Sequence, residues 1–171
     1  MNQEIEKIVN QKNEIVASLI HRLKTTNDFY EGNQVALILI DHFRGKNIED
    51  CLFELIKEPK WQRYNGTLLY ALEEYTNNSK YLYFLVDLIL KNEKLNDGEI
   101  FMGAYSMILN LQPPFDRKEI TKSLQRVKKE RKKKNLKEST KKLISSLINF
   151  LEGQRNIAKF YSRFGRVSIA E

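Results

Sequence analysis

Residues 61–75 have the sequence WQRYNGTLLYALEEY, and this stretch decides how the middle of the chain folds. Pro59 ends the apolar segment before it, because proline cannot continue a helix. Asn65 stands just before a new apolar run, and its side chain is suited to cap the free amides of a first helical turn. The stretch therefore predicts a turn between two antiparallel helices, with Asn65 as the cap of the second helix.

Apolar residues recur at intervals of three and four along most of the chain, which is the spacing of amphipathic helices. In the first segment the stripe consists of Ile5, Ile8, Val9, Val16, Leu19, Ile20 and Leu23. Further helices are expected at 33–43, 48–59, 66–75, 79–91, 97–111, 116–134, 146–153 and 156–164. A buried helix is favoured at 33–43, with a strand as the alternative. The predicted fold class is all-α.

The sequence contains a weak internal repeat. A shift of 32 to 33 residues places residues 52–56 on 85–89 and residues 66–69 near 98–101. Each copy corresponds to two antiparallel helices, and one helix pair cannot bury its apolar face alone. We therefore expect a short HEAT-like α-solenoid of stacked antiparallel helix pairs, with residues 1–171 as one domain. Tyr70 and Leu72 are expected to pack between the stacked pairs.

The net charge of +7 is distributed unevenly. Residues 1–116 carry a net charge of −5, whereas residues 117–142 carry +10 and form one strongly basic helical segment. The start of the chain lacks the pattern of a signal peptide, and no apolar run approaches the length of a membrane span. The single cysteine cannot form an internal disulfide. We therefore expect a cytoplasmic protein that does not contact a membrane.

Signatures of catalysis and of ligand binding are mostly missing. Asp41 and His42 are adjacent, but neighbours on a helix point about 100° apart, and no nucleophile is evident. Structural roles are favoured for His42 and for His21, the only other histidine. For Cys51, a small buried hydrophobe is favoured over a reactive thiol. Neither metal-ligand spacing nor a glycine-rich phosphate loop occurs, so we expect no enzymatic activity, metal, cofactor or small-molecule substrate.

Several carboxylates are spaced so that they share a helix face, and aromatic residues lie close to them in the sequence. Such a face can steer and hold a basic protein, although an ordinary solvated face explains the same spacing. The tryptophan of this group either fills the turn against a neighbouring helix or anchors a partner. The candidate partner-binding residues are Asp50, Glu54, Glu58, Trp61, Arg63, Tyr64, Glu73 and Glu74.

The basic segment 117–142 offers a second candidate site. A cluster of cations can neutralise the phosphates of RNA or DNA, but no aromatic residue lies within the segment to stack on a base. A solvated, lysine-rich helix end is the alternative explanation. Beyond Val127 the apolar stripe is lost, so this end is expected to project into water or to fray. The candidate nucleic-acid contacts are Lys128, Lys129, Arg131, Lys132, Lys133 and Lys134.

Residues 48–111 resemble bacterial immunity proteins with HEAT-like helical repeats, which belong to polymorphic toxin and contact-dependent growth-inhibition systems. The residues that carry the resemblance are Trp61, Arg63, Gly66, Thr67, Leu68, Leu69, Tyr70, Ala71, Leu72 and Tyr75. The resemblance implies a non-enzymatic protein that binds its cognate toxin domain and blocks the active site. The basic segment after Asp116 departs from the acidic character common in inhibitors of nucleases. A small, basic, helical nucleic-acid-binding protein is the alternative.

Overall fold

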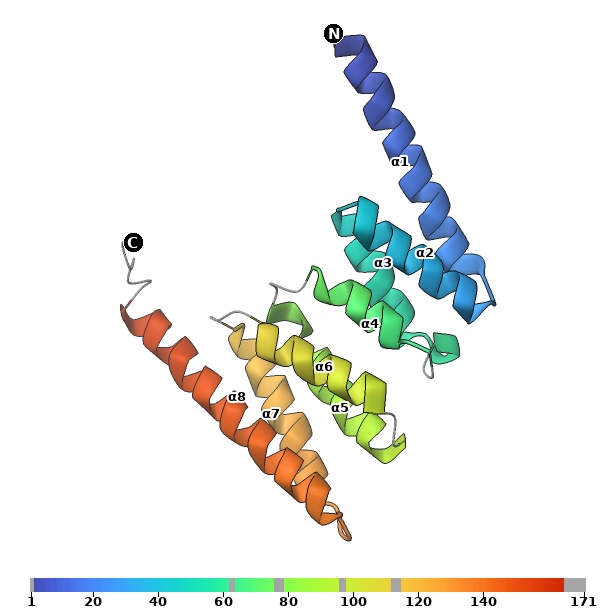
Figure 1. The fold of residues 1–171 in the computed structure, drawn as a ribbon. Helices are drawn as coiled ribbons and strands as arrows, with labels where there is room; N and C mark the ends of the chain where they lie inside the picture. Colours follow the sequence, from blue (N-terminus) through green and yellow to red (C-terminus); the bar gives the residue numbers. More distant parts are fainter. Residues whose placement is uncertain (1, 62–63, 76–78, 96–97, 112–114, 165–171) are drawn as a thin grey trace. The chain divides into compact units, whose positions relative to one another are not determined.

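The computed structural model describes residues 2–61, 64–75, 79–95, 98–111 and 115–164, and every regular element in these ranges is helical. The prediction of an all-α protein is confirmed. The elements drawn in Figure 1 are, in chain order, α1 (Asn2–Thr25), α2 (Phe29–His42), α3 (Lys46–Lys57), the 3-10 turn η1 (Pro59–Trp61), α4 (Gly66–Glu73), the 3-10 turn η2 (Ser79–Tyr81), α5 (Leu82–Leu95), α6 (Gly98–Asn110), α7 (Arg117–Arg131) and α8 (Glu138–Phe164).

The chain divides into two compact units, unit 1 with Met1–Tyr75 and unit 2 with Thr76–Glu171. Unit 1 carries nine basic and twelve acidic residues, a net charge of −3, whereas unit 2 carries twenty basic and ten acidic residues, a net charge of +10. Compact units can belong to one domain, so the division does not test the prediction of a single domain.

Unit 1 is built from α1 to α4. Both α1 and α4 contact α2 and α3, so the four helices share one core. Each helix contributes fully buried leucines, among them Leu23, Leu39, Leu52, Leu68 and Leu72. Segment 33–43 is helical rather than a strand, and its helix begins earlier than expected, at Phe29. The reason is Asp28, whose carboxylate accepts hydrogen bonds from the first free amides of α2.

The apolar stripe of α1 is buried only in its second half. Val16 and Leu23 are buried, whereas Ile5 and Val9 are exposed and Ile8 is 61% exposed. In Figure 1 the first turns of α1 extend beyond the end of α2. The spacing of the stripe therefore predicts the helix correctly, but its burial depends on how far the neighbouring helices reach.

Trp61 fills the space between η1 and α2. Its ring is fully buried and packs edge-on against Phe29, with 5.1 Å between the ring centroids. The ring lies directly over Gly32, where any side chain would overlap it. Lys60 ties the same turn to α1, because its Nζ donates to the carbonyl oxygen of Lys24 at 3.0 Å. The prediction that Trp61 fills the turn against a neighbouring helix is confirmed.

Asn65 precedes α4 as expected, but it does not cap the helix. Its backbone has φ −89° and ψ 5°, which is not the extended conformation that directs a capping side chain at the free amides. The side chain is 1% exposed and has no hydrogen-bond partner among the described residues. Only its carbonyl oxygen takes part, accepting from the Leu69 amide at 2.8 Å. The predicted side-chain cap is therefore wrong.

Unit 2 is built from α5 to α8. Helix α5 contacts α6 and α7, and α7 contacts α8, so the charged helix α7 lies between two neighbours. The buried side chains include Leu85 and Ile89 of α5, Met107 of α6, Val127 of α7 and Leu151 of α8. Burial of one face of α7 positions the cations on its other faces.

The ends of α7 and α8 differ from the prediction. α7 stops at Arg131 instead of Lys134, and the chain turns through Asn135, which has φ 63°. Asparagine is one of the few residues that adopt this left-handed conformation readily. α8 is one continuous helix through Gly153, where two shorter helices were expected. A glycine inside a helix costs only about 1 kcal/mol, so residues buried on both sides of it, such as Leu151, maintain the helix.

Two glycines give a test of packing with opposite expected signs. Gly32→Ala should destabilise unit 1 by about 2 kcal/mol, because the new methyl group must displace the buried Trp61 ring. Gly153→Ala, which meets open space within α8, should stabilise unit 2 by about 0.5–1 kcal/mol. Urea unfolding followed by Trp61 fluorescence reports on unit 1, since Trp61 is the only tryptophan, and circular dichroism reports on the helices of both units. Equal effects of the two substitutions would contradict this account of Gly32.

Candidate functional site

The predicted carboxylate stripe is present on α3, but it is partly neutralised. Asp50 and Glu54 are exposed, and Glu58 follows the last turn of the helix as its C-cap. The Lys57 Nζ lies 2.6 Å from a Glu54 oxygen, and the Lys60 Nζ lies 3.7 Å from a Glu58 oxygen. These exposed pairs are weak, so the carboxylates remain available to a stronger partner.

Tyr70 and the end of α4 form a second part of the same unit. Tyr70 is 57% exposed, so its predicted place in a buried interface is not seen within unit 1. Glu73 and Glu74 follow it by three and four residues, which places them beside Tyr70 on the helix surface. Glu74 pairs with Arg44 at 3.1 Å. We call Asp50, Glu54, Glu58, Tyr70, Glu73 and Glu74 the acidic surface of unit 1.

The sequence contained a signal for the exposure of Tyr70. Leu68 and Leu72 are one turn apart and both fully buried. Tyr70 lies two residues from each, which turns it about 200° around the helix axis from both. It therefore points away from the core that the two leucines enter.

Two further tyrosines are exposed near the start of α2. Tyr64 is 50% exposed and stacks on Phe29, with 4.0 Å between ring centroids and 15° between ring planes. Tyr30 is 75% exposed. Trp61 is fully buried and therefore presents no surface to a partner, which corrects its place among the contact residues. Arg63 lies outside the described residues.

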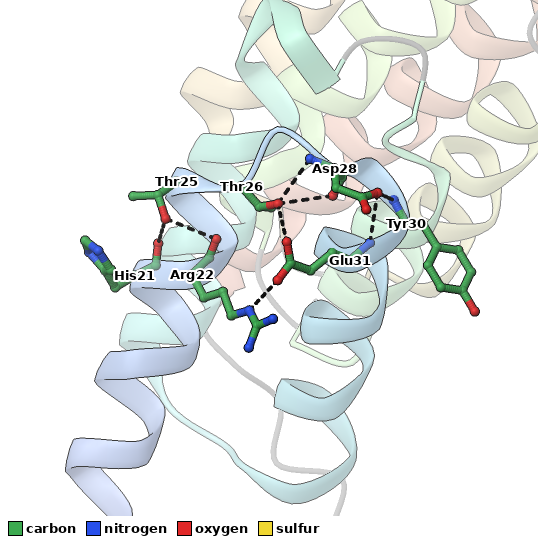
Figure 2. A network of polar contacts seen from close by, with 7 residues as sticks. All are labelled: His21, Arg22, Thr25, Thr26, Asp28, Tyr30 and Glu31. Carbon is green, nitrogen blue, oxygen red and sulfur yellow. Dashed lines mark hydrogen bonds and ion pairs between the residues drawn. The ribbon is translucent and has the colours of Figure 1, made fainter.

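A polar network holds the start of α2 in place, as Figure 2 shows. The Asp28 carboxylate accepts from the Tyr30 amide at 2.9 Å, and the Glu31 carboxylate accepts from the Thr26 hydroxyl at 2.6 Å and from Arg22. The hydrogen bonds from Thr26 and Arg22 lower the pKa of Glu31. In Figure 2 the ring of Tyr30 points away from this network, so a fixed helix start carries an exposed aromatic side chain.

The basic segment is only partly free of ion pairs. Lys128 lies 3.2 Å from Glu152 of α8, and Lys133 lies 2.7 Å from Glu130. Lys128 thus links the end of α7 to α8, whereas Lys133 pairs within the segment itself. The cations at 128, 129 and 131–134 are all exposed, so this end projects into water, which is one of the two outcomes expected from the sequence. Of the six predicted nucleic-acid contacts, four are exposed and have no ion-pair partner within the described part of the chain: Lys129, Arg131, Lys132 and Lys134.

Arg126 is the centre of an ion network between α5 and α7. It donates to Asp87 at 2.5 Å and to Glu130 at 2.9 Å, while Lys91 and Lys133 each lie 2.7 Å from one of these two carboxylates. The Glu130 side chain is only 1% exposed, so it belongs to the buried face of α7, where the neighbouring cations neutralise its charge. Three cations surround two carboxylates, which leaves the network with a net positive charge.

The network shifts the pKa values of Asp87 and Arg126. Burial raises the pKa of Asp87, but the hydrogen bonds from Lys91 and Arg126 outweigh it, so the pKa lies below its ordinary value. Burial likewise lowers the pKa of Arg126, and its hydrogen bonds to Glu130 and Asp87 outweigh that effect and raise it. Asp87 and Arg126 therefore both remain charged at neutral pH.

Two cavities lie along α7. One, of about 500 Å³, is at the turn into α8 and is lined by Arg131, Lys133, Asn135, Leu136, Lys141, Ile144 and Ser145. The other, of about 410 Å³, lies between α5 and α7 and is lined by Tyr83, Lys122, Gln125, Arg126 and Lys129. Tyr83 belongs to neither candidate set from the sequence. It lies far from the basic segment along the chain, and only the packing of α5 on α7 brings it there.

The described residues show no arrangement that favours catalysis. Burial raises the pKa of Cys51 to about 11, so its thiol stays protonated, as expected for a buried hydrophobe. His21 and His42 are both exposed. Among the described residues, no cluster of His, Cys, Asp and Glu is suited to hold a metal ion. None of the described helices combines the length and apolar character needed to cross a membrane.

Asp87→Asn tests the network through its pH dependence. At pH 7 we expect a loss of about 2 kcal/mol, because Arg126 and Lys91 lose a charged partner in a half-buried site. The pKa of Asp87 is depressed in the folded state, so its contribution is complete above the ordinary value of 3.8 and is lost as the pH falls below it. Urea unfolding followed by circular dichroism at pH 7, 5 and 3 should show the variant converging on the parent.

The matched control is Asp41→Asn, at an exposed position of unit 1. It should change the stability by less than about 0.5 kcal/mol at each pH. A constant difference between the Asp87 variant and the parent down to pH 3 would contradict the linkage.

Comparison of the chain with models of protein families, with curated proteins and with solved structures finds no match. The resemblance to immunity proteins therefore rests on the residues within 48–111 and stays a prediction.

Proposed function

We propose that this chain is a non-enzymatic immunity protein that binds a cognate bacterial toxin domain in the cytoplasm and occludes its active site. The observation that carries the proposal is the acidic surface of unit 1, where Tyr70 is exposed beside Glu73 and Glu74. A few aromatic and arginine side chains that become buried on binding supply most of the energy of many protein interfaces. Surrounding carboxylates raise the association rate of a basic partner.

The residues of the resemblance act as a scaffold for this surface. Leu68, Leu69, Ala71 and Leu72 are all buried, so the TLLYALE segment fixes α4 against α3 and directs Tyr70 outward. A toxin contact on a packed helix loses little conformational entropy on binding, because its backbone is already ordered.

The proposal includes the HEAT-like arrangement expected from the sequence. The internal repeat aligns α3 with α5 and α4 with α6. In each copy the two helices contact each other, which supports helix pairs as the repeating element. Stacking of successive pairs into a solenoid remains part of the proposal.

Charge reversal on α3 tests the electrostatic part of the interface. Glu54→Lys combined with Glu58→Lys should weaken binding to the cognate toxin domain by about tenfold or more, mainly through slower association. Glu6→Lys combined with Glu14→Lys changes the net charge equally on exposed positions of α1 and should have little effect. Surface plasmon resonance gives the rate constants, and growth of cells that express the toxin gives protection. Equal losses in the two double variants would show that only the overall charge matters.

Tyr70→Ala tests the anchor. The substitution should weaken toxin binding roughly thirtyfold, or about 2 kcal/mol, mainly through faster dissociation. Thermal unfolding should be nearly unchanged because the side chain is largely exposed. Tyr83→Leu, an aromatic substitution in unit 2, is the control and should retain both affinity and protection. Parent-like affinity of the Tyr70 variant would remove α4 from the interface.

A further inference from the structure

The groove between α5 and α7 brings an aromatic side chain and cationic side chains together, although these residues are far apart in the sequence. Tyr83 of α5 is 37% exposed and lines the groove together with Lys122, Gln125, Arg126 and Lys129 of α7. The cavity of about 410 Å³ is within the range of pockets that accept small ligands or single nucleotide units. We propose that this groove binds single-stranded nucleic acid, with a base stacked on Tyr83 and phosphates held by Lys122 and Lys129.

Some cations that line the groove are neutralised by carboxylates, and others are available to bind a ligand. Arg126 is engaged by Asp87 and Glu130 and therefore does not act as a phosphate contact. Lys129 is exposed and has no ion-pair partner among the described residues. Lys122 pairs at 3.1 Å with Glu119, one turn away; the Lys122 side chain is 59% exposed and that of Glu119 is 18% exposed. The exposed ammonium group of Lys122 has further N–H donors that can reach a phosphate while this contact stays in place. The cations available to a ligand thus lie at both ends of the groove.

The spacing along α7 fits an extended strand. Lys118, Lys122, Gln125 and Lys129 follow one another at intervals of four, three and four residues, so they share the solvent-facing side of the helix. At about 1.5 Å per residue the row is roughly 16 Å long, which corresponds to a footprint of a few nucleotides. The unpaired cations of the following turn, such as Arg131, extend the positive surface beyond it.

Tyr83 and Gln125 distinguish nucleic acid from other polyanions. A tyrosine ring provides a face on which any base can stack, and a glutamine amide can both donate to and accept from a base edge. An acidic peptide or a sulfated polymer uses the lysines but gains nothing from the aromatic ring. A duplex keeps its bases stacked on each other, so the groove favours a single strand.

The experiment uses the full chain and 12-nucleotide oligouridine and oligothymidine probes with a fluorescent label, followed by anisotropy at several salt concentrations. Tyr83→Leu should weaken binding about tenfold with an unchanged salt dependence, whereas Tyr83→Phe should bind within about twofold of the parent. Lys122→Gln combined with Lys129→Gln should weaken binding and lower the slope of log affinity against log salt by about 1.4, roughly 0.7 for each lost phosphate contact.

Matched controls separate the groove from general charge. Lys142→Gln combined with Lys159→Gln removes the same charge from exposed positions of α8 and should leave affinity and slope nearly unchanged. A labelled 12-base-pair duplex should bind more weakly than either single strand, and polyglutamate should compete poorly. The comparison of oligouridine with oligothymidine shows whether RNA or DNA is preferred.

Three results would overturn the inference: parent-like binding by Tyr83→Leu, an equal loss in Tyr83→Phe and Tyr83→Leu, or displacement by polyglutamate as effective as by the unlabelled strand. The inference is independent of the proposed toxin binding. Tyr70→Ala should retain nucleic-acid affinity, and Tyr83→Leu should retain toxin protection, so failure of one proposal is distinguishable from failure of the other.

Discussion

The burial of Trp61 over Gly32 is the contact on which unit 1 depends. The indole ring occupies the volume that a side chain at position 32 would take, and it joins η1 to α2 while the cores of α3 and α4 form on either side of the turn. Its indole nitrogen is buried without a hydrogen-bond partner among the described residues, so the packing of the large ring outweighs the loss of one hydrogen bond. The turn between α3 and α4 is thereby fixed, and with it the direction of Tyr70 and the surrounding carboxylates.

In unit 2, a network of neutralised charges joins α5 to α7, whereas the joining contact in unit 1 is apolar. The buried stripe of α7 passes from Ile120 and Val127 to Glu130, a carboxylate that Arg126 links to Asp87 of α5. Removing one partner of such a pair destabilises the fold far more than replacing both partners with apolar residues, because the remaining charge stays buried. The same network holds Arg126 at the floor of the groove, so the surface cations of α7 stand above a rigid base. Stability and ligand chemistry in this unit therefore rest on shared residues.

The two units present surfaces of opposite character. Unit 1 offers carboxylates and exposed tyrosines, which suit a basic protein partner, and unit 2 offers unpaired cations beside one tyrosine, which suit a phosphate strand. An overall net charge of +7 describes neither surface. The proposed toxin would bind the first surface, and a nucleic acid would bind the second. Variants confined to one unit thus give separable information about each partner.

Periodicity alone was enough to predict an all-α chain, because a helix needs only local spacing of apolar residues and suitable ends. It also located the turn at Trp61. The 200° offset of Tyr70 from Leu68 and Leu72 around the helix axis was a signal that Tyr70 is exposed. The predicted side-chain cap of Asn65 is wrong because the backbone there does not adopt the extended conformation that a capping side chain needs, and the residue type alone does not determine that conformation. Two helices were predicted where α8 is one, because burial against other helices outweighs the small cost of one glycine within the helix. The position of Tyr83 beside Lys122 and Lys129 could not be predicted, because these residues are distant in sequence and meet only when α5 packs on α7. Local spacing determined the helices, while contacts between distant segments decided which side chains share a surface.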